Sequence, residues 1–435
     1  MGGVTERMAT ARERIRALGS VLTIADVRRL WVSQVLSEVG DWAARLALAV
    51  LVFDRSGSAL LSAATLAVSY LPYLISPVLT GWAQRFSLRR LMIGADLMRG
   101  SLFVLLVLPL PVWSLLVLAF VAALATPPFE AARVGVMPDA AGEDRLPDAL
   151  ALSTITFQTA QVVGFGISGV LMALVGPQPA LILNAATFFA SAVVLFGMRA
   201  GRNRPEPEHA MTRVREAASA ALRRPLLRRV IVLTLLVAFA DAAVNALLPV
   251  FVRTNGYSPL VLTALAATAP LVGAVSGSVA PREGENARLV RVAAWLIVGG
   301  GGVAAVLFAL TGVVTSTTAG IVVAVLAVAA FGATIAADIP AITVAMRSVD
   351  DELRAPLIAV VQPGLMGIQA LGAVVAGAVA LVLQPALVMS LALVVAVVYG
   401  VVVLARPARV IDLRDSSDSQ DTLVEVDGHD SAHSD

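Results

Sequence analysis

Acidic side chains interrupt long apolar stretches of this sequence at six positions. They are Glu38, Asp41, Asp96, Glu130, Asp241 and Asp338. A charge near the centre of a membrane helix costs roughly 2.5–3.5 kcal/mol on insertion scales, so each of these residues must be paired or face water. Carboxyl groups in such places take up and release protons, or form ion pairs that fasten helices together. The sequence must therefore supply helices that bring them to partners or to a polar cavity.

The stretch RRLWVSQVLSEVGDWAARLAL, residues 28–48, holds three charges at i, i+3 and i+7, namely Glu38, Asp41 and Arg45. A helix places all three on one side. Asp41 stands about 16 Å along that helix from Leu30, which is close to the middle of a bilayer. Two interpretations follow. Asp41 is either a proton site whose protonation changes as the protein opens to one side or the other, or half of a static ion pair with Arg45.

The composition is that of an integral membrane protein. The chain has 435 residues, of which 58% are hydrophobic and 14% charged, and its mean hydropathy is +0.86. Apolar windows of the roughly 20 residues that a spanning helix needs recur along it. They predict an all-α fold with twelve transmembrane helices, at 30–53, 59–82, 90–109, 112–137, 149–175, 178–198, 229–252, 259–280, 289–311, 317–345, 356–383 and 385–405. The absence of cysteine excludes disulfides and zinc–thiolate sites.

The arginines predict the orientation in the membrane, because positive charges favour cytoplasmic loops. They concentrate before the first span, after the second and in the central and C-terminal polar segments, whereas Arg55 and Arg253 lie on the opposite side. We therefore expect a multi-pass protein of the cell (inner or plasma) membrane with both termini in the cytoplasm. The predicted domains are a cytoplasmic segment at 1–29, a six-helix bundle at 30–198, a cytoplasmic linker at 199–228, a second six-helix bundle at 229–405 and a disordered acidic cytoplasmic tail at 406–435.

An internal repeat relates the two predicted bundles. A shift of 200 residues aligns Asp41 with Asp241, and Arg45 with Asn245. Later in each half the shift is 208, and the aligned pairs are Glu130 with Asp338, Gln161 with Gln369, Gly164 with Gly372, and Gly169 with Gly377. An even number of spans precedes the break, so both halves start from the same side of the membrane and the repeat is parallel.

This architecture resembles the major facilitator superfamily, and several motifs resemble its drug-exporter branch that includes macrolide-efflux and enterobactin-export proteins. The motifs are GDWAARLALAVLVFDRSGSAL at 40–60, GWAQRFSLRRLMIGADLMR at 81–99, PFEAARVGVMPDAAGEDRL at 128–146, ILNAATFFAS at 182–191 and LRRPLLRR at 222–229. Two positions depart from the family pattern. Gln84 replaces the acid of the loop 2–3 signature, and Phe165 replaces the proline of the helix 5 signature.

The resemblance implies a central cavity lined by helices 1, 4, 7 and 10, with helices 5 and 11 flanking it. The residues expected at this proton or substrate cavity are Glu38, Asp41, Arg45, Gln158, Gln161, Asp241, Asn245, Gln362 and Gln369. Asp241 has no arginine near it on its own helix, so it is the better candidate for a carboxyl group that is protonated in some states. The four glutamines fit ordinary hydrogen bonding between helices as well as substrate contact.

The other charged residues of the spans and of loop 2–3 are expected at a cytoplasmic gate. They are Arg85, Arg89, Arg90, Asp96, Arg99, Glu130, Arg133 and Asp338. In this hypothesis Glu130, which has Arg133 at i+3, forms an ion pair with the arginines of loop 2–3 near the cytoplasmic end of helix 4. Asp338 takes the same position in the second half. Asp96 and Arg99, at i and i+3, neutralise each other and support that loop. The glycines expected to allow close helix packing or bending are Gly164, Gly166, Gly169, Gly372 and Gly377.

These features together predict a secondary transporter that exports a small hydrophobic or amphipathic compound by alternating access, with protons as the coupling ion. Facilitated uptake, lipid flipping and a transport-dead sensor or scaffold stay open as alternatives. Gly299–Gly302 lacks the Lys-Ser/Thr of a phosphate-binding loop, and no catalytic motif indicates an enzyme. We expect no cofactor, no metal and no nucleic-acid partner, and a monomer that contacts a small-molecule substrate and the lipid bilayer.

Overall fold

The computed structural model describes residues 18–83, 85–201, 223–281, 284–349 and 351–405. Within these residues the chain forms twelve helical segments of membrane-spanning length, which confirms the predicted all-α membrane fold. The first six are α2 (Ala25–Ser56), α3 (Ala59–Tyr70) with η1 (Leu71–Ile75) and α4 (Ser76–Ala83), α5 (Leu88–Leu106), α6 (Val112–Ala123) with α7 (Thr126–Ala141), η2 (Glu143–Arg145) with α8 (Leu146–Val175), and α9 (Gln178–Phe196).

The second six segments follow the linker. They are α11 (Pro225–Thr254), α12 (Pro259–Val279), α13 (Asn286–Leu296) with η3 (Ile297–Gly301) and α14 (Gly302–Thr311), α15 (Thr317–Ile335) with α16 (Asp338–Arg347), α17 (Asp351–Val379) and α18 (Pro385–Ala405). Ten of the twelve segments are long and apolar enough to cross a membrane by length and composition alone. The two exceptions are α2 and α5, each of which has three charged residues inside its predicted span.

Two spans break near their middle, in matching places of the two halves. α6 gives way to α7 at Pro127 and Pro128, and α15 gives way to α16 shortly before Pro340. Proline lacks the N–H that a helix interior needs but fits the first turn of a new helix. Glu130 and Asp338 therefore stand just after corresponding breaks, Glu130 early in α7 and Asp338 at the first position of α16.

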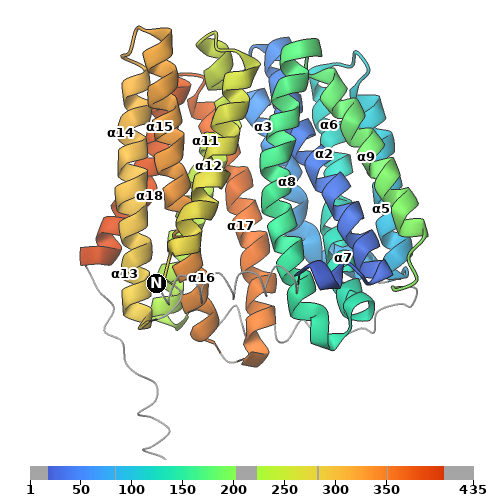
Figure 1. Ribbon diagram of the computed structural model, residues 1–435. Helices are drawn as coiled ribbons and strands as arrows, with labels where there is room; N and C mark the ends of the chain where they lie inside the picture. The colour runs from blue at the N-terminus through green and yellow to red at the C-terminus, as the bar shows by residue number, and fades with distance from the viewer. Residues whose placement is uncertain (1–17, 84, 202–222, 282–283, 350, 406–435) are drawn as a thin grey trace, which may run out of the picture.

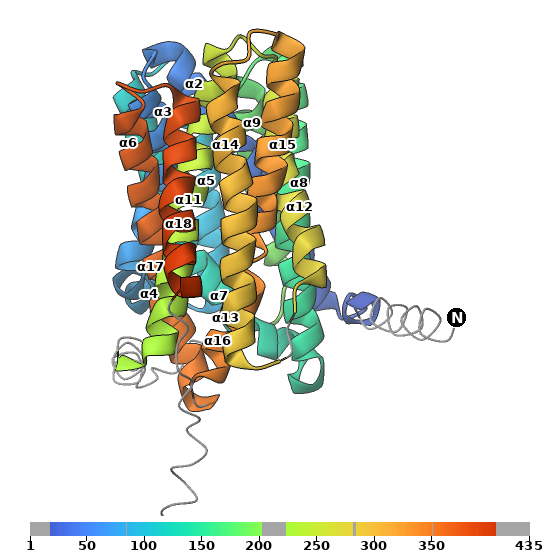
Figure 2. The same ribbon diagram turned by 90° about the vertical axis from the view of Figure 1, so that its left-hand side faces the viewer.

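The helices lie in two groups that face each other. Figure 1 shows α2 to α9, in blue to green, on one side of the molecule and α11 to α18, in yellow-green to red, on the other. In Figure 2, turned by 90°, helices of the second set such as α14 and α18 face the viewer. Contacts between the groups run from α8 to α12, from α3 to α11 and α17, and from α2 to α11. We call these the N-terminal and C-terminal groups. The domain boundaries stay a prediction, and Gln84, the segment 202–222 of the predicted linker and the tail at 406–435 lie outside the described residues.

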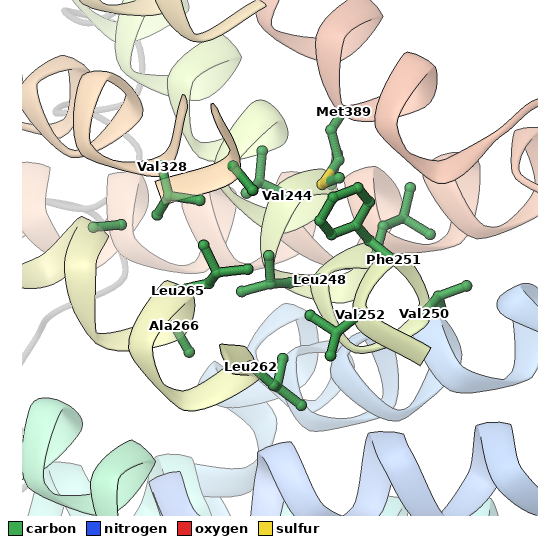
Figure 3. Packing of buried hydrophobic residues seen from close by; sticks show 14 of the residues in the cluster. Val244, Leu248, Val250, Phe251, Val252, Leu262, Leu265, Ala266, Val328 and Met389 are labelled. Atoms are coloured by element: carbon green, nitrogen blue, oxygen red, sulfur yellow. The ribbon is translucent and has the colours of Figure 1, made fainter. Parts of the chain in front are cut away.

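The two groups pack together at one end of the molecule. We call the end where α2, α8 and α11 begin the arginine-rich end, and the end where these helices finish the arginine-poor end. One buried apolar cluster at the arginine-poor end joins both groups and includes Val50, Met172, Phe251 and Leu262. Figure 3 shows part of it, in which side chains of α11 such as Phe251 pack with those of α12 and α18.

The groups are separate at the arginine-rich end. Three buried apolar clusters occur there among the described residues, and each belongs to one group alone. The cluster of the N-terminal group contains Leu30 and Met198, and those of the C-terminal group contain Val230 and Leu227. The described part of the chain is therefore closed at the arginine-poor end, while its two groups share no apolar core at the arginine-rich end.

Glycines of the repeat make the same contact inside each group. A methyl group on Gly164 of α8 would lie 2.7 Å from the backbone oxygen of Val39 on α2. A methyl group on Gly372 of α17 would lie 2.6 Å from the backbone oxygen of Phe239 on α11. Gly164 and Gly372 are 208 positions apart, and Val39 and Phe239 are 200 positions apart. The contact therefore pairs residues aligned by the shift of 208 with residues aligned by the shift of 200.

A second pair of repeated glycines packs across the two groups. Gly169 of α8 lies against Thr263 of α12, so closely that a methyl group would overlap the threonine side chain. Gly377 of α17 lies against α3, where a methyl group would be 2.7 Å from the Cβ of Ala63. Thr263 and Ala63 are again 200 positions apart. Gly166 does not share this role, because a methyl group there would have nothing within 4 Å.

We expect Gly169→Ala to destabilise the state in which the arginine-poor end is closed, because overpacking a tight contact typically costs about 1–3 kcal/mol. Thermal unfolding of the purified protein in detergent measures the effect as a lower midpoint temperature. Gly166→Ala is the matched control on the same helix and should leave that temperature unchanged. Equal unfolding temperatures for the two variants would contradict the packing role of Gly169.

Candidate functional site

Asp41 is held by groups from two other helices of the N-terminal group. The Asn184 side chain of α9 donates a hydrogen bond to Asp41 Oδ1 at 3.1 Å. On the other side, Nη1 of Arg99 on α5 lies 3.8 Å from Asp41 Oδ2. The carboxylate of Asp41 therefore has both a donor and a cation beside it.

Arg99 is the centre of this network. Its Nη2 lies 2.5 Å from Asp96 Oδ1 one turn earlier on α5, and the second oxygen of Asp96 accepts a hydrogen bond from Ser191 of α9 at 2.5 Å. The side chains of Arg99 and Asp96 are only 3% and 0% exposed. Phe129 and Phe188 lie against the guanidinium, with ring centroids 4.4 and 4.3 Å from its central carbon. Two carboxylates thus share one buried cation, enclosed by aromatic rings.

This arrangement corrects the predicted partner of Asp41. Arg45, which stands one helical turn after Asp41, forms no ion pair with it within 4.0 Å among the described residues. The guanidinium of Arg45 instead lies over the ring of Trp42, 4.8 Å from its centroid, and 5.7 Å from that of Tyr70 on α3. The Asp96–Arg99 ion pair was predicted as a support for loop 2–3, but its contacts are with Asp41 and α9.

Asp241, the counterpart of Asp41, is held by amides. Asn245 Nδ2 donates a hydrogen bond to Asp241 Oδ1 at 2.8 Å, and Gln369 Nε2 of α17 lies 3.5 Å from Asp241 Oδ2. No ion pair involves Asp241 in the described part of the chain. The sequence had indicated this difference, because Asn245 stands where the first half has Arg45.

Two cavities meet at Asp241. The smaller, of about 100 Å³, lies toward the arginine-poor end beside Asp41, Arg45 and Tyr70. The larger, of about 670 Å³, runs between α8 and α12 toward the arginine-rich end. Gln161, Asp241 and Asn245 line both of them. The larger volume is typical of sites that enclose a small organic molecule.

Asp338 also lines the larger cavity, although the sequence had placed it in a cytoplasmic gate. The break between α15 and α16 puts it there, on the same cavity as Asp241, Gln158 and Gln369. Gln362 lines neither cavity and is exposed. It follows from helical geometry that Gln362, two turns before Gln369, lies on the same helix face but about 10 Å nearer the arginine-rich end.

Glu38 and the predicted gate residues of α7 have other neighbours. Glu38 lines neither cavity, and its charged neighbours are Arg133, Glu130, Asp41 and Arg45. Arg133 donates a hydrogen bond of 2.6 Å to the Ser153 hydroxyl of α8. Glu130 accepts a hydrogen bond from Tyr73 of η1. These contacts join helices of the N-terminal group to each other.

The predicted ion pairs between the gate acids and loop 2–3 are absent among the described residues. Neither Glu130 nor Asp338 forms an ion pair with Arg85, Arg89 or Arg90 in that part of the chain. Arg89 instead donates hydrogen bonds to the last backbone oxygens of α9, at Leu195 with 3.1 Å and at Phe196. This is the usual role of an arginine at a helix C-terminus, where carbonyl groups lack partners.

An ion pair between the groups closes the arginine-poor end. Arg253 Nη2 at the end of α11 lies 2.5 Å from Asp54 Oδ2 at the end of α2. Both side chains are partly exposed, at 32% and 37%. The pair lies beyond the shared apolar cluster, so polar and apolar contacts both hold this end together.

The fold and this site define a class of protein: a helical membrane carrier with two related six-helix groups around a polar cavity. A family model described as Major Facilitator Superfamily matches residues 30–368. The chain belongs to the Major Facilitator Superfamily, whose members are transporters and not enzymes. This confirms the superfamily that the sequence motifs had indicated, without assigning a branch within it.

Comparison with individual proteins agrees with this assignment. The MFS-type transporter YfiS of Bacillus subtilis (strain 168), described as uncharacterized, is 28% identical over 206 residues, which are 46% of this chain and 49% of YfiS. The match thus spans about half the length of that relative.

Solved structures share the fold at low sequence identity. A bacterial homolog of the human lysosomal transporter Spinster, in an inward-facing and unoccupied conformation, has a TM-score of 0.66 and 15% identity over 89% of this chain and 96% of its own. A variant of the nucleoside transporter NupG has a TM-score of 0.67 and 13% identity over 86% and 97%. A variant of the peptide transporter POT has a TM-score of 0.67 and 13% identity over 87% and 93%.

Sequence reasoning missed the roles of Arg99 and Asn184 at Asp41. A signal for Arg99 was available. In the predicted spans Asp41 stands eleven positions after Leu30, and Arg99 stands nine positions after Arg90. Because both helices enter from the arginine-rich end, the two residues reach similar depths of about 16 and about 14 Å. Asn184 is an amide in the interior of a mostly apolar helix and carried no comparable signal.

We expect Arg99→Gln to destabilise the protein strongly, because it leaves the carboxylates of Asp41 and Asp96 without a cation. Breaking a buried ion pair by removing one partner typically costs about 3–5 kcal/mol. Thermal unfolding in detergent and the yield of folded protein measure the effect. Arg45→Gln is the matched control and should destabilise the protein less, because Arg45 lies over aromatic rings and forms no ion pair within 4.0 Å among the described residues. A larger loss for Arg45→Gln than for Arg99→Gln would show that Arg45 is the main partner of Asp41.

Proposed function

We propose that this protein is a secondary transporter that exports a small hydrophobic or amphipathic compound, such as a drug, antibiotic, siderophore or metabolite, in exchange for protons. The observation that carries the proposal is the position of Asp241. Its carboxyl group has amide partners and no ion pair within the described residues, and it stands where the two cavities meet. A carboxyl group at such a place can be reached from either side in turn as the two groups rock.

The two midplane acids, Asp41 and Asp241, have different roles in this proposal. Asp41 is a fixed structural partner, because Arg99 and Asn184 hold its carboxyl group. Asp241 exchanges the proton, since its carboxyl group has no ion pair among the described residues. The pseudo-symmetric repeat thus provides one fixed acid and one exchangeable acid at the same depth.

Export, rather than uptake, is favoured by the motifs that resemble the drug-exporter branch, such as those at 40–60 and 81–99. The arginine distribution favours a cytoplasmic arginine-rich end, which makes the described conformation inward-facing. The larger cavity then meets substrate from the cytoplasm. Facilitated uptake and lipid flipping by the same fold are the competing functions, and a transport-dead scaffold is a third. We take the working unit to be a monomer, because each chain has both groups and a whole cavity.

Proton coupling is tested in inverted membrane vesicles with an imposed pH gradient, using uptake of the fluorescent compound doxorubicin. We expect Asp241→Asn to abolish the part of the uptake that depends on the gradient, because the amide cannot exchange a proton. Asp41→Asn is the matched repeat position, and it should keep gradient dependence at a lower rate. If Asp241→Asn retains full gradient dependence, Asp241 is not the coupling site. If the wild type shows no gradient-driven uptake of doxorubicin or of other amphipathic drugs, proton-coupled drug export fails.

Alternating access is tested at the ion pair between Asp54 and Arg253. The chain has no cysteine, so Leu66→Cys, on the wall of the smaller cavity, provides a single reporter thiol. We expect Arg253→Asp to speed alkylation of this thiol by a membrane-impermeant maleimide added outside, because two like charges then face each other. The charge swap Asp54→Arg with Arg253→Asp should restore slow alkylation. A swap that reacts as fast as the single variant would exclude the ion pair as a closing contact.

A further inference from the structure

We infer that the outer face of α13, η3 and α14 binds an anionic phospholipid. Arg288 and Arg291 hold its phosphate. One of its acyl chains lies in a surface groove beside Gly299 and Gly302. This face lies outside both cavities, so the site is separate from the proposed transport site.

The groove lies on the outer surface of the C-terminal group. Its volume is about 420 Å³, and the residues that line it are Val298, Gly299, Gly302, Val303, Val306 and Leu307. All six are apolar and belong to one span, which packs against α15 and α18 on its other side. Figure 1 shows α14 at the edge of the molecule, and in Figure 2 it faces the viewer. The groove is therefore turned to the surrounding membrane.

Helix packing requires only two of the four consecutive glycines at this place. A methyl group on Gly300 would lie 2.8 Å from a backbone oxygen of α15, and one on Gly301 would lie 3.1 Å from a side chain of α18. A methyl group on Gly299 or Gly302 would have nothing within 4 Å. Glycine destabilises a helix relative to alanine, so these two glycines have no packing reason inside the protein. The space that they leave open is part of the groove.

The corresponding span of the first half differs at this face. A shift of 198 residues aligns α5 with α13, with Arg90 at Arg288 and Val104 at Gly302. Val104 is 50% exposed, so a side chain covers the surface that Gly302 leaves open. η3 is also a single π-helical turn, a rare conformation that occurs often at functional sites. The groove is thus a feature of the C-terminal group and not of the repeated fold.

Two arginines stand on the same face, nearer the arginine-rich end. Arg288 and Arg291 are exposed, and neither forms an ion pair or a side-chain hydrogen bond with another described residue. Exposed residues follow from them at steps of three and four, which keeps them on one side of the span. They are Arg288, Arg291, Trp295, Gly299, Val303 and Val306. Cations, an aromatic ring and the apolar groove therefore succeed each other with depth.

This order matches one leaflet of a bilayer. Tryptophan favours the membrane–water interface, and Trp295 is 63% exposed. At 1.5 Å per residue, Arg291 lies about 6 Å outside Trp295 and Leu307 about 18 Å inside it. The hydrocarbon of one leaflet is about 15 Å thick. A phospholipid with its phosphate at the arginines thus has an acyl chain at the depth of the groove, and basic residues at this level attract anionic lipids.

A second copy of the chain fits this face less well. Small residues also allow membrane helices to pack closely, so a dimer is the competing occupant. A symmetric dimer brings the same surface of both copies together. Arg288 and Arg291 of the two copies would then meet and repel each other, whereas a phosphate has the opposite charge.

Binding is tested by native mass spectrometry of the full-length protein in detergent. The probes are dioleoylphosphatidylglycerol and dioleoylphosphatidylcholine, which share their acyl chains and differ in net charge. We expect the anionic lipid to bind at least about tenfold more tightly. Glycerophosphoglycerol, its headgroup without chains, should not displace it. Equal affinity for the two lipids, displacement by the headgroup alone, or a protein dimer in place of the lipid complex would each overturn the inference.

Arginine variants test the phosphate contact. The double variant Arg288→Gln with Arg291→Gln should weaken binding of the anionic lipid at least about tenfold. Arg90→Gln is the matched control, because Arg90 is the exposed counterpart of Arg288 on α5. Equal weakening by the control would show attraction to the whole positive surface, and unchanged binding in the double variant would place the lipid elsewhere. Either result overturns the inference.

Glycine variants test the groove. Gly299→Leu with Gly302→Leu fills the groove with side chains, and both positions have room for them. We expect about tenfold weaker binding of the anionic lipid, as the lost contact of about two CH₂ groups would give. Gly94→Leu is the matched control, because Gly94 on α5 is also exposed with nothing within 4 Å. Undiminished binding in the filled variant would overturn the role of the groove.

The unmodified protein provides a second measurement that does not depend on how the variants fold. Phosphatidylglycerol with a diazirine on its acyl chain is photocrosslinked in proteoliposomes, and the labelled residues are mapped by mass spectrometry. We expect label at 298–307 at least about fivefold above that at 100–109, the corresponding part of the α5 span. Equal labelling of the two segments would show ordinary contact with the bilayer and overturn the inference.

Discussion

The guanidinium of Arg99 lies between the carboxylates of Asp41 and Asp96, inside a helix bundle that a membrane surrounds. Each of these charges alone would be expensive there, and the network makes them compatible with an apolar environment. It also explains why α2 and α5 tolerate a composition that the other ten spans do not have. The carboxylates of Asp41 and Asp96 depend on this one cation, and α9 adds hydrogen bonds to both of them.

In the described residues, the C-terminal group holds its midplane acid Asp241 without an ion pair. Its backbone repeats the first group closely, because Gly164 and Gly372 make the same contact with α2 and α11. The burial pattern also repeats residue by residue over 41–50 and 241–250. What differs is the set of partners of the repeated acid. Amides of Asn245 and Gln369 hold Asp241, whereas Arg99 and Asn184 hold Asp41. A symmetric scaffold thereby holds two acids in different surroundings, one with a cation and one with amides alone among the described residues.

Much of the fold could be predicted from the sequence, because apolar length and a repeat in sequence are local properties. The sequence repeat aligns Gly164 with Gly372 and Gly169 with Gly377, and each of these glycines makes a close helix contact in the structure. The partner of Asp41 could not be predicted in the same way. Spacing within one helix favours Arg45, but the choice between Arg45 and Arg99 depends on how α2 is rotated against α5 and α9, and a single sequence does not record that rotation.

Depth along a helix explains the remaining differences at the site. Asp338 belongs to the cavity because α15 breaks before it, and Gln362 falls outside because it stands two turns from Gln369. The cavity therefore ends at the midplane acids on one side, where the groups are packed together by Gly169, Gly377 and the shared apolar cluster. Any motion that opens the arginine-poor end must separate those contacts. Asp241 is one of three residues, with Gln161 and Asn245, that line both cavities. The position of this carboxyl group links the packing of the helices to the exchange that we propose.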